Sequence, residues 1–189
     1  MTVNGAPKVR SERGFSLLEV MVSIAIMTVG LVSLLGVFGL AMASTQSSLQ
    51  NAISKQIANE AMEGILTARE TQNLTWAQIA NTGNGGIFLS GFQAVDCAGA
   101  DGIIGTADDS ACGPEKLTLP GPDGIYGTAD DIVMPLTNYQ RQIAIAQALD
   151  QNGNPIQTLN TVTITVKYTN PRVNTAQNYV LTTYISEYR

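Results

Sequence analysis

The most pronounced pattern in the chain is an apolar, uncharged run of 24 residues, from residue 20 to residue 43. A helix rises about 1.5 Å per residue, so the run is about 36 Å long and spans a hydrocarbon core of roughly 30 Å. A secretory signal peptide fits poorly, because its apolar core has only about 7–15 residues and ends at a small-residue cleavage site. The pattern therefore predicts a transmembrane helix over residues 15–43.

From Ser44 onward the pattern changes to a single apolar stripe with the i, i+3, i+4 spacing of a helix face. The stripe consists of Leu49, Ala52, Ile53, Ile57, Ala61, Ile65 and Ala68. No proline interrupts residues 15–72, so we predict one helix from about Phe15 to about Glu70. A coiled coil is less favoured, because sustained heptads are missing. The second half of the helix should pack on a globular head formed by residues 44–189.

The C-terminal part of the chain alternates between apolar and polar residues, as half-buried strands do. Strands are predicted over residues 139–148, 161–168 and 179–186, with a further strand over residues 87–95. Turn residues separate the last three strands, at 152–155 and 170–171. A short helical turn over 75–79, with Trp76 in the core, should follow the long helix. An antiparallel sheet packed on one helix stripe is an α+β fold.

Charge is unevenly distributed along the chain, which has 15 acidic residues, 10 basic residues and no histidine. The segment from Asp96 to Asp131 contains eight acidic residues and one basic residue, Lys116. The lack of histidine excludes His-based catalytic triads and most zinc sites. No basic patch is present, so nucleic-acid binding is not indicated. We predict that the protein is not an enzyme.

A seven-residue signature, GFSLLEV at Gly14–Val20, leads into the apolar run. Three basic residues precede it: Lys8, Arg10 and Arg13. Over roughly residues 13–65 the chain resembles the type IV pilin and type II secretion pseudopilin family. The LLEV start and the TVGL at residues 28–31 are most similar to minor pilins of the PilV type. The resemblance implies a pilin-like fold with a leader peptide, residues 1–14, that is removed.

The same resemblance implies roles for three residues of the signature. A prepilin peptidase would cut after Gly14, Phe15 would be methylated, and Glu19 would pair with the N-terminal amine of a neighbouring pilin subunit. A carboxylate at the edge of a lipid-facing helix is costly and is by default a functional candidate. The three basic residues before the signature should stay in the cytoplasm. The globular head should then lie outside the bacterial inner membrane before assembly.

An acidic, glycine-rich loop occurs twice, as Asp101–Asp109 and as Asp123–Asp131, with eight of nine positions identical. Ca²⁺ takes 6–8 oxygen ligands from such loops. The candidate ligands are Asp101, Thr106, Asp108, Asp109, Asp123, Thr128, Asp130 and Asp131. The alternative is a pair of Asp-Gly turns with solvated carboxylates. Adjacent aspartates repel without a cation, so the sequence favours Ca²⁺.

Two cysteines, Cys97 and Cys112, bracket the first acidic loop. Outside the cytoplasm an even number of cysteines favours a disulfide. A metal pair or a catalytic thiol would need a histidine or further cysteines. The second acidic loop has no such clasp, so its order should depend more on the ion.

These observations favour a structural subunit of a type IV pilus or of a secretion pseudopilus. The alternative is a membrane-anchored, Ca²⁺-dependent adhesin that does not polymerise. An anchor of that kind needs neither Glu19 nor the cleavage signature. A hydrolase that uses the aspartate pairs is disfavoured, because no nucleophile–base arrangement accompanies them.

Overall fold

The computed structural model describes residues 14–170 and 175–188. The predicted leader up to residue 13, with its basic residues, and the residues 171–174 of one predicted turn lie outside the described part. The elements in chain order are α1 (Leu17–Glu70), η1 (Trp76–Gln78), η2 (Thr82–Asn84), β1 (Gln93–Ala94), α2 (Asp109–Cys112), β2 (Lys116–Leu119), β3 (Ile132–Pro135), β4 (Tyr139–Leu149), β5 (Pro155–Asn170) and β6 (Thr175–Ser186). The chain divides into two compact units between Thr45 and Gln46.

The first unit contains the apolar half of α1, and its described residues are exposed from 14 to 42. Among the described helices, α1 alone is long and apolar enough to cross a membrane. The hydroxyls of Ser23, Thr28 and Ser33 donate to carbonyls one turn earlier, at 2.7, 2.5 and 2.8 Å. These bonds pair the hydroxyl protons of the three residues within the helix itself, which suits a lipid environment.

The second unit packs the rest of α1 against a sheet and confirms the predicted α+β fold. The buried residues of α1 are Ile53, Ser54, Ile57, Ala58, Ala61, Met62, Ile65 and Ala68. Leu49 and Ala52, which belonged to the predicted stripe, are exposed, and the first fully buried residue of the helix is Ile53. Ala58 and Met62 widen the stripe beyond the prediction, as is typical of a helix that packs on a globular core.

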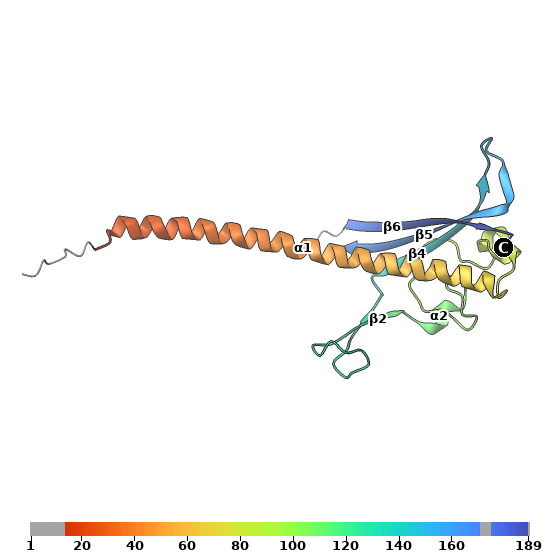
Figure 1. Cartoon of the computed structure of the whole chain (residues 1–189), viewed down its shortest axis with the longest axis horizontal. Helices are drawn as coiled ribbons and strands as arrows, with labels where there is room; N and C mark the ends of the chain where they lie inside the picture. Colours follow the sequence, from red (N-terminus) through yellow and green to blue (C-terminus); the bar gives the residue numbers. More distant parts are fainter. Residues whose placement is uncertain (1–13, 171–174, 189) are drawn as a thin grey trace, which may run out of the picture. The chain divides into compact units, whose positions relative to one another are not determined.

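The main sheet has four antiparallel strands in the order β1-β4-β5-β6, and Figure 1 shows its three long strands beside the second half of α1. The strands predicted over 139–148, 161–168 and 179–186 are confirmed as parts of β4, β5 and β6. Ile164 pairs with Ile143 on one side and with Leu181 on the other. The inward residues form one core with the helix stripe, among them Ile143, Ile145, Val162, Ile164, Val166, Tyr168 and Ile185.

The strand predicted over residues 87–95 is wrong for most of its length, because only Gln93–Ala94 pairs with β4. Gly91 has a φ of +84°, which breaks the extended run. The side chain of Asn81, rather than a longer strand, binds the backbone of β4 next to this segment. It donates to the carbonyl of Ile143 and accepts from the amide of Ile145, both at 2.8 Å. The predicted turn over 75–79 is present as η1, and its Trp76 is half-buried beside the core.

A second, two-stranded sheet formed by β2 and β3 was not predicted. Its register pairs Leu117 with Met134 and Leu119 with Ile132, so it brackets the second acidic loop. Figure 1 shows this hairpin standing apart from the four-stranded sheet. All four residues of β3 are exposed, whereas Leu117 of β2 is half-buried against the core, so the hairpin contacts the head through β2.

Candidate functional site

The predicted processing and assembly residues lie together at the start of α1. Gly14 and Phe15 are exposed and precede the helix, and Glu19 is the acidic residue of its first turn. Nothing lies within 4 Å of the position that a side chain at Gly14 would occupy. Within the described part of the chain, no hydrogen bond to the Glu19 carboxylate is present. A negative charge is favoured at a helix N-terminus, and this one is accessible to a group from outside the chain.

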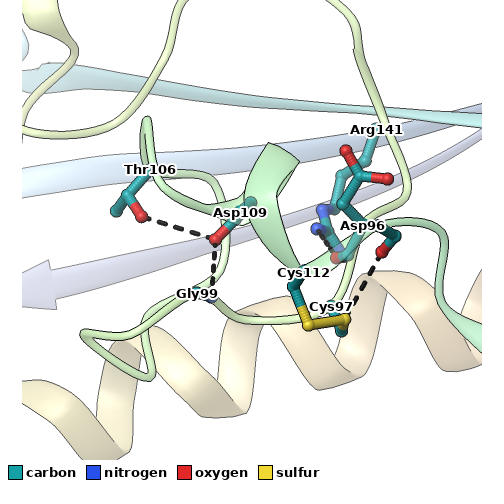
Figure 2. Close-up of a disulfide and its surroundings, with 8 residues drawn as sticks. Asp96, Cys97, Gly99, Thr106, Asp109, Cys112 and Arg141 are labelled. Atoms are coloured by element: carbon teal, nitrogen blue, oxygen red, sulfur yellow. Dashed lines mark hydrogen bonds between the residues drawn. A yellow bond between two sulfur atoms is a disulfide. The ribbon is translucent and has the colours of Figure 1, made fainter.

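The predicted disulfide is formed between Cys97 and Cys112, whose Cα atoms lie 5.7 Å apart. Backbone bonds close the same loop at its base, because the amide of Cys97 donates to Gly113 and that of Glu115 to Val95. Figure 2 shows the disulfide at the end of α2, on the same loop as Asp109. The first acidic loop is therefore closed both covalently and by hydrogen bonds.

In the first loop, both oxygens of each paired aspartate accept hydrogen bonds. Asp108 accepts from the Thr106 hydroxyl at 2.6 Å and from the Asp101 amide at 3.2 Å. Asp109 accepts from the amides of Gly99 and Gly105, at 3.2 and 2.6 Å. The Thr106 hydroxyl and the Asp101 amide lower the pKa of Asp108, whereas burial raises the pKa of Asp109. Loop amides thus offset the repulsion that we expected to require a cation.

The second loop repeats most of this network. Asp130 accepts from the Thr128 hydroxyl at 2.6 Å and from the Asp123 amide at 3.4 Å. Asp131 accepts from the Gly127 amide at 2.7 Å. The Thr128 hydroxyl is the main cause that lowers the pKa of Asp130. The two loops therefore share one backbone design.

The structure extends the repeat by two residues, to Gly99 and Gly121, which sequence reasoning missed. A Cβ atom at Gly99 would overlap the carboxylate of Asp108, and one at Gly121 would overlap that of Asp130. The sequence signal was present, because Gly99 and Gly121 are separated by the same 22 residues as the loops. Glycine at this position lets the carboxylate approach the backbone closely.

A cation fits the first loop better than the second. Among the described residues, Asp101, Asp108 and Asp109 form the one acidic group whose ligand oxygens all lie within 4.8 Å of one another. The Thr106 hydroxyl has a single hydrogen but lies 2.6–3.4 Å from three oxygens, on Ile103, Asp108 and Asp109. One hydrogen cannot form good hydrogen bonds to all three oxygens at once. A hard cation such as Ca²⁺ would stabilise a cluster of oxygens of this kind.

The second loop has no disulfide, as expected, but the structure closes it in another way. The paired strands β2 and β3 close its base from Leu119 and Ile132 outward. This closure was not predicted, because four-residue strands are too short to show an alternating pattern. The expected dependence of the loop's order on an ion stays a prediction.

A buried charge cluster beside the first loop was also missed. Arg141 is only 3% exposed, and its guanidinium donates to the backbone carbonyl of Asp96 (Figure 2). Burial lowers the pKa of Arg141. The negative charges of four acidic residues act in the opposite direction and raise it: Glu115, Asp109, Glu60 and Asp96. Arg141 has the same parity in β4 as the buried Ile143 and Ile145, and this was the signal that could have revealed it.

Within this cluster, the carboxyl of Glu115 has one oxygen that is buried and has no hydrogen-bond partner. Burial raises the pKa of Glu115 to about 7, and the charge of Glu60 and a hydrogen bond with Glu60 add to the effect. The charge of Arg141 opposes it. The cluster joins α1 to the segment that enters β2.

Comparison with known families identifies the N-terminal region. Residues 9–35 match the prokaryotic N-terminal methylation motif, which is the prepilin signature of type IV pilins and pseudopilins. The match includes Gly14, Phe15 and Glu19. No curated protein and no solved structure matches the chain significantly.

Proposed function

We propose that the protein is a structural subunit of a type IV pilus or of a type II secretion pseudopilus, and that it has no enzymatic activity. The methylation motif at residues 9–35 carries the proposal, because it places a processing signature directly before an exposed apolar helix. The head supports it, since one long helix packed on an antiparallel sheet is the layout of a pilin-like fold.

In this proposal the subunit first sits in the inner membrane with its head outside the cytoplasm. A prepilin peptidase removes the leader after Gly14, and the new N-terminal Phe15 is methylated. During assembly the apolar surface of α1 leaves lipid and packs against the helices of other subunits. Glu19 then pairs with the α-amine of a neighbour, which offsets the cost of a carboxylate in an apolar bundle.

The test is mass spectrometry of the protein from sheared filaments and from membranes. The filament fraction should contain a chain that begins with methylated Phe15. A chain that begins at Met1, or that is cut near residue 43, would contradict the proposal. A processed chain that stays in membranes under conditions of filament assembly would favour the non-polymerising adhesin.

We further propose that the first acidic loop binds Ca²⁺. The gathered oxygens of Asp101, Asp108 and Asp109, together with Thr106, support this proposal. The second loop carries the matching residues Asp123, Thr128, Asp130 and Asp131, and we propose it as a weaker site. Extracellular modules of this kind bind Ca²⁺ at roughly 10⁻⁴–10⁻³ M.

A further inference from the structure

A cavity of about 240 Å³ lies between the first acidic loop, the segment before that loop and β4. Its lining includes Asp96 from the segment before the loop, Thr106 and Asp109 of the loop, and Arg141 of β4. Ala107, which also lines the cavity, is exposed, so the cavity opens to solvent along the loop. Sites for drug-sized ligands hold about 300–1,000 Å³, so this cavity suits a smaller ligand.

The guanidinium of Arg141 reaches this cavity with few partners of its own. The side chain is 3% exposed, although a guanidinium carries several N–H donors that each require an acceptor. Within the described part of the chain, its hydrogen bonding consists of one contact of 3.4 Å, from Nη2 to the backbone carbonyl of Asp96. Its Nη1 atom is buried and has no partner. Figure 2 shows the guanidinium beside Asp96. A buried donor without an acceptor is costly, so a ligand that brings an oxygen to Arg141 is favoured.

Two carboxylates on the same cavity limit which ligand can enter. The negative charges of Asp96 and Asp109 both act on Arg141. Asp109 accepts hydrogen bonds from two loop amides, whereas no hydrogen bond reaches the half-buried carboxylate of Asp96 within the described part of the chain. An anion would be repelled by the carboxylates, and a cation by the guanidinium. A neutral hydroxyl both donates and accepts, so neighbouring hydroxyls satisfy both kinds of group.

We propose that this cavity binds one neutral sugar ring, held by Arg141 and Asp96. One hydroxyl of the sugar accepts from Nη1 of Arg141, and a neighbouring hydroxyl donates to the carboxylate of Asp96. The C–H groups of the ring pack on the apolar part of the lining, which includes Leu89 and Ala94. The site needs no bound ion, because neither anchoring residue belongs to the proposed Ca²⁺ ligands.

The duplicated loop supplies a matched control for this site. The first copy is held against the segment before it, since the amide of Leu89 donates to the carbonyl of Gly105 at 2.8 Å. In the second copy, nothing lies within 4 Å of a Cβ placed at Gly127, the counterpart of Gly105. Ala107 of the first loop therefore lines the cavity, whereas its counterpart Ala129 is exposed on a loop without this covering surface.

The test is saturation-transfer NMR with the processed full-length chain, in a detergent without a sugar headgroup. The probes are D-glucose, D-galactose, D-mannose and their methyl glycosides, in the presence of a chelator so that no Ca²⁺ contributes. Transfer to at least one hexose is expected. A methyl glycoside that binds as well as its free sugar identifies the end residue of a glycan as the ligand, and loss of binding on methylation identifies a free sugar. No transfer to any hexose would overturn the proposal, as would binding of acetate or methylammonium in place of the sugars.

Substitutions at the cavity locate the binding. Ala107→Trp fills the opening and should abolish the transfer, while the melting temperature followed by circular dichroism stays unchanged because Ala107 is exposed. Ala129→Trp should retain the transfer. Arg141→Gln should weaken binding by roughly tenfold or more, because a hydrogen bond from a charged donor is lost. Arg141 is buried, so Ala107→Trp decides the question if Arg141→Gln fails to fold. Transfer that survives Ala107→Trp, or that Ala129→Trp removes equally, would overturn the proposal.

This inference goes beyond the proposed filament function, and the outcomes keep the two apart. A processed chain that enters filaments but binds no hexose would refute the sugar site and leave the subunit function standing. A chain that binds a hexose but never enters filaments would refute the subunit function alone.

Discussion

At the scale of single residues, the buried cluster around Arg141 is a balance of opposing charges. Arg141 lies in the core, and its guanidinium has a buried nitrogen without a hydrogen-bond partner. Glu115 has a matching unpartnered oxygen. The charge of Arg141 favours the ionised form of Glu115, but burial outweighs this effect. Glu60 disturbs the balance, because it adds a second carboxyl beside Glu115.

This balance predicts a pH dependence of stability. The pKa of Glu115 is about 7 in the folded chain against an ordinary value of 4.5, so the folded state binds this proton more tightly. Its contribution is complete below about pH 4.5 and is lost as the pH rises through 7. At pH 8, Glu115→Gln should therefore stabilise the head by about 1 kcal/mol, after allowance for solvent screening of a half-exposed group.

The measurement is thermal unfolding of the processed full-length chain in detergent, followed by the fluorescence of Trp76. Trp76 is the one tryptophan of the chain and lies against the core of the head. The gain from Glu115→Gln should shrink between pH 8 and pH 5. Glu63→Gln, on the exposed side of α1, serves as the control. A gain that is independent of pH would show that Glu115 is not the titrating group.

The glycines at the start of the two loops give a second prediction at this scale. Gly99→Ala should destabilise the head by roughly 1–3 kcal/mol, because the new methyl group overlaps the carboxylate of Asp108 in a packed loop. Gly121→Ala creates the same overlap in the hairpin but should leave the Trp76 transition unchanged. Equal shifts for both variants would mean that the hairpin unfolds together with the core.

At the scale of elements, the sequence predicted the helix and the strands that bury one face in the core, because their apolar pattern marks the buried face. β4, β5 and β6 alternate because one face of each lies on α1, and α1 shows its stripe for the same reason. The β2–β3 hairpin was missed because each of its strands has only four residues, which is too short for an alternating pattern to mark them. Residues 87–95 look like a strand, but the side chain of Asn81 pairs with β4 in their place.

The candidate site was predicted only where the chemistry is local. The disulfide and the repeated loop follow from spacing in the sequence. The offset of the aspartate charges by loop amides depends on backbone directions that only the fold reveals. The cluster of Arg141 with Glu60 and Glu115 joins three distant segments, and pairing over such distances leaves no mark in a single sequence.

The prediction at the scale of elements concerns the effect of Ca²⁺ on the two acidic loops. Ca²⁺ at ten times its Kd should stabilise the head by about 1.4 kcal/mol, which raises Tm by roughly 3–6 °C. Asp108→Asn should remove this shift, because it replaces a carboxylate oxygen of the gathered group. Asp130→Asn should leave most of it, since the second loop stands outside the core. Mg²⁺ should stabilise less, because it requires a tighter octahedron.

Chelator, Ca²⁺ and Mg²⁺ would be compared on the same detergent-solubilised chain, with Trp76 as the reporter. A Tm that does not respond to Ca²⁺ would leave the loops as turns held by their amides. A full response in the Asp108→Asn chain would place the ion elsewhere.

At the scale of the whole molecule, the two units have opposite solvent requirements. The first unit exposes apolar side chains over the length of a membrane span, and the second buries its apolar residues in its own core. The free energy of burying apolar surface scales with its area, so the first unit is stable only in lipid or among similar helices. In the proposed filament Glu19 makes these two environments unequal, because lipid offers no counter-charge and the α-amine of a neighbouring subunit would supply one.

This inequality gives the last prediction. Glu19→Ala should insert into the membrane as well as the parent chain or better, because it removes a charge of a kind that costs about 2.5–3.5 kcal/mol at the centre of a membrane-spanning helix. Its incorporation into filaments should fall, since the proposed pairing of the carboxylate with a neighbouring α-amine would be lost. The ratio of filament to membrane protein, measured by immunoblot of sheared and membrane fractions, separates the two effects. Glu63→Ala, an exposed glutamate of the head, is the matched control. Because both variants keep the proposed cleavage site after Gly14, both should still begin at Phe15. Normal incorporation of a correctly processed Glu19→Ala chain would show that the carboxylate is not what distinguishes filament from lipid.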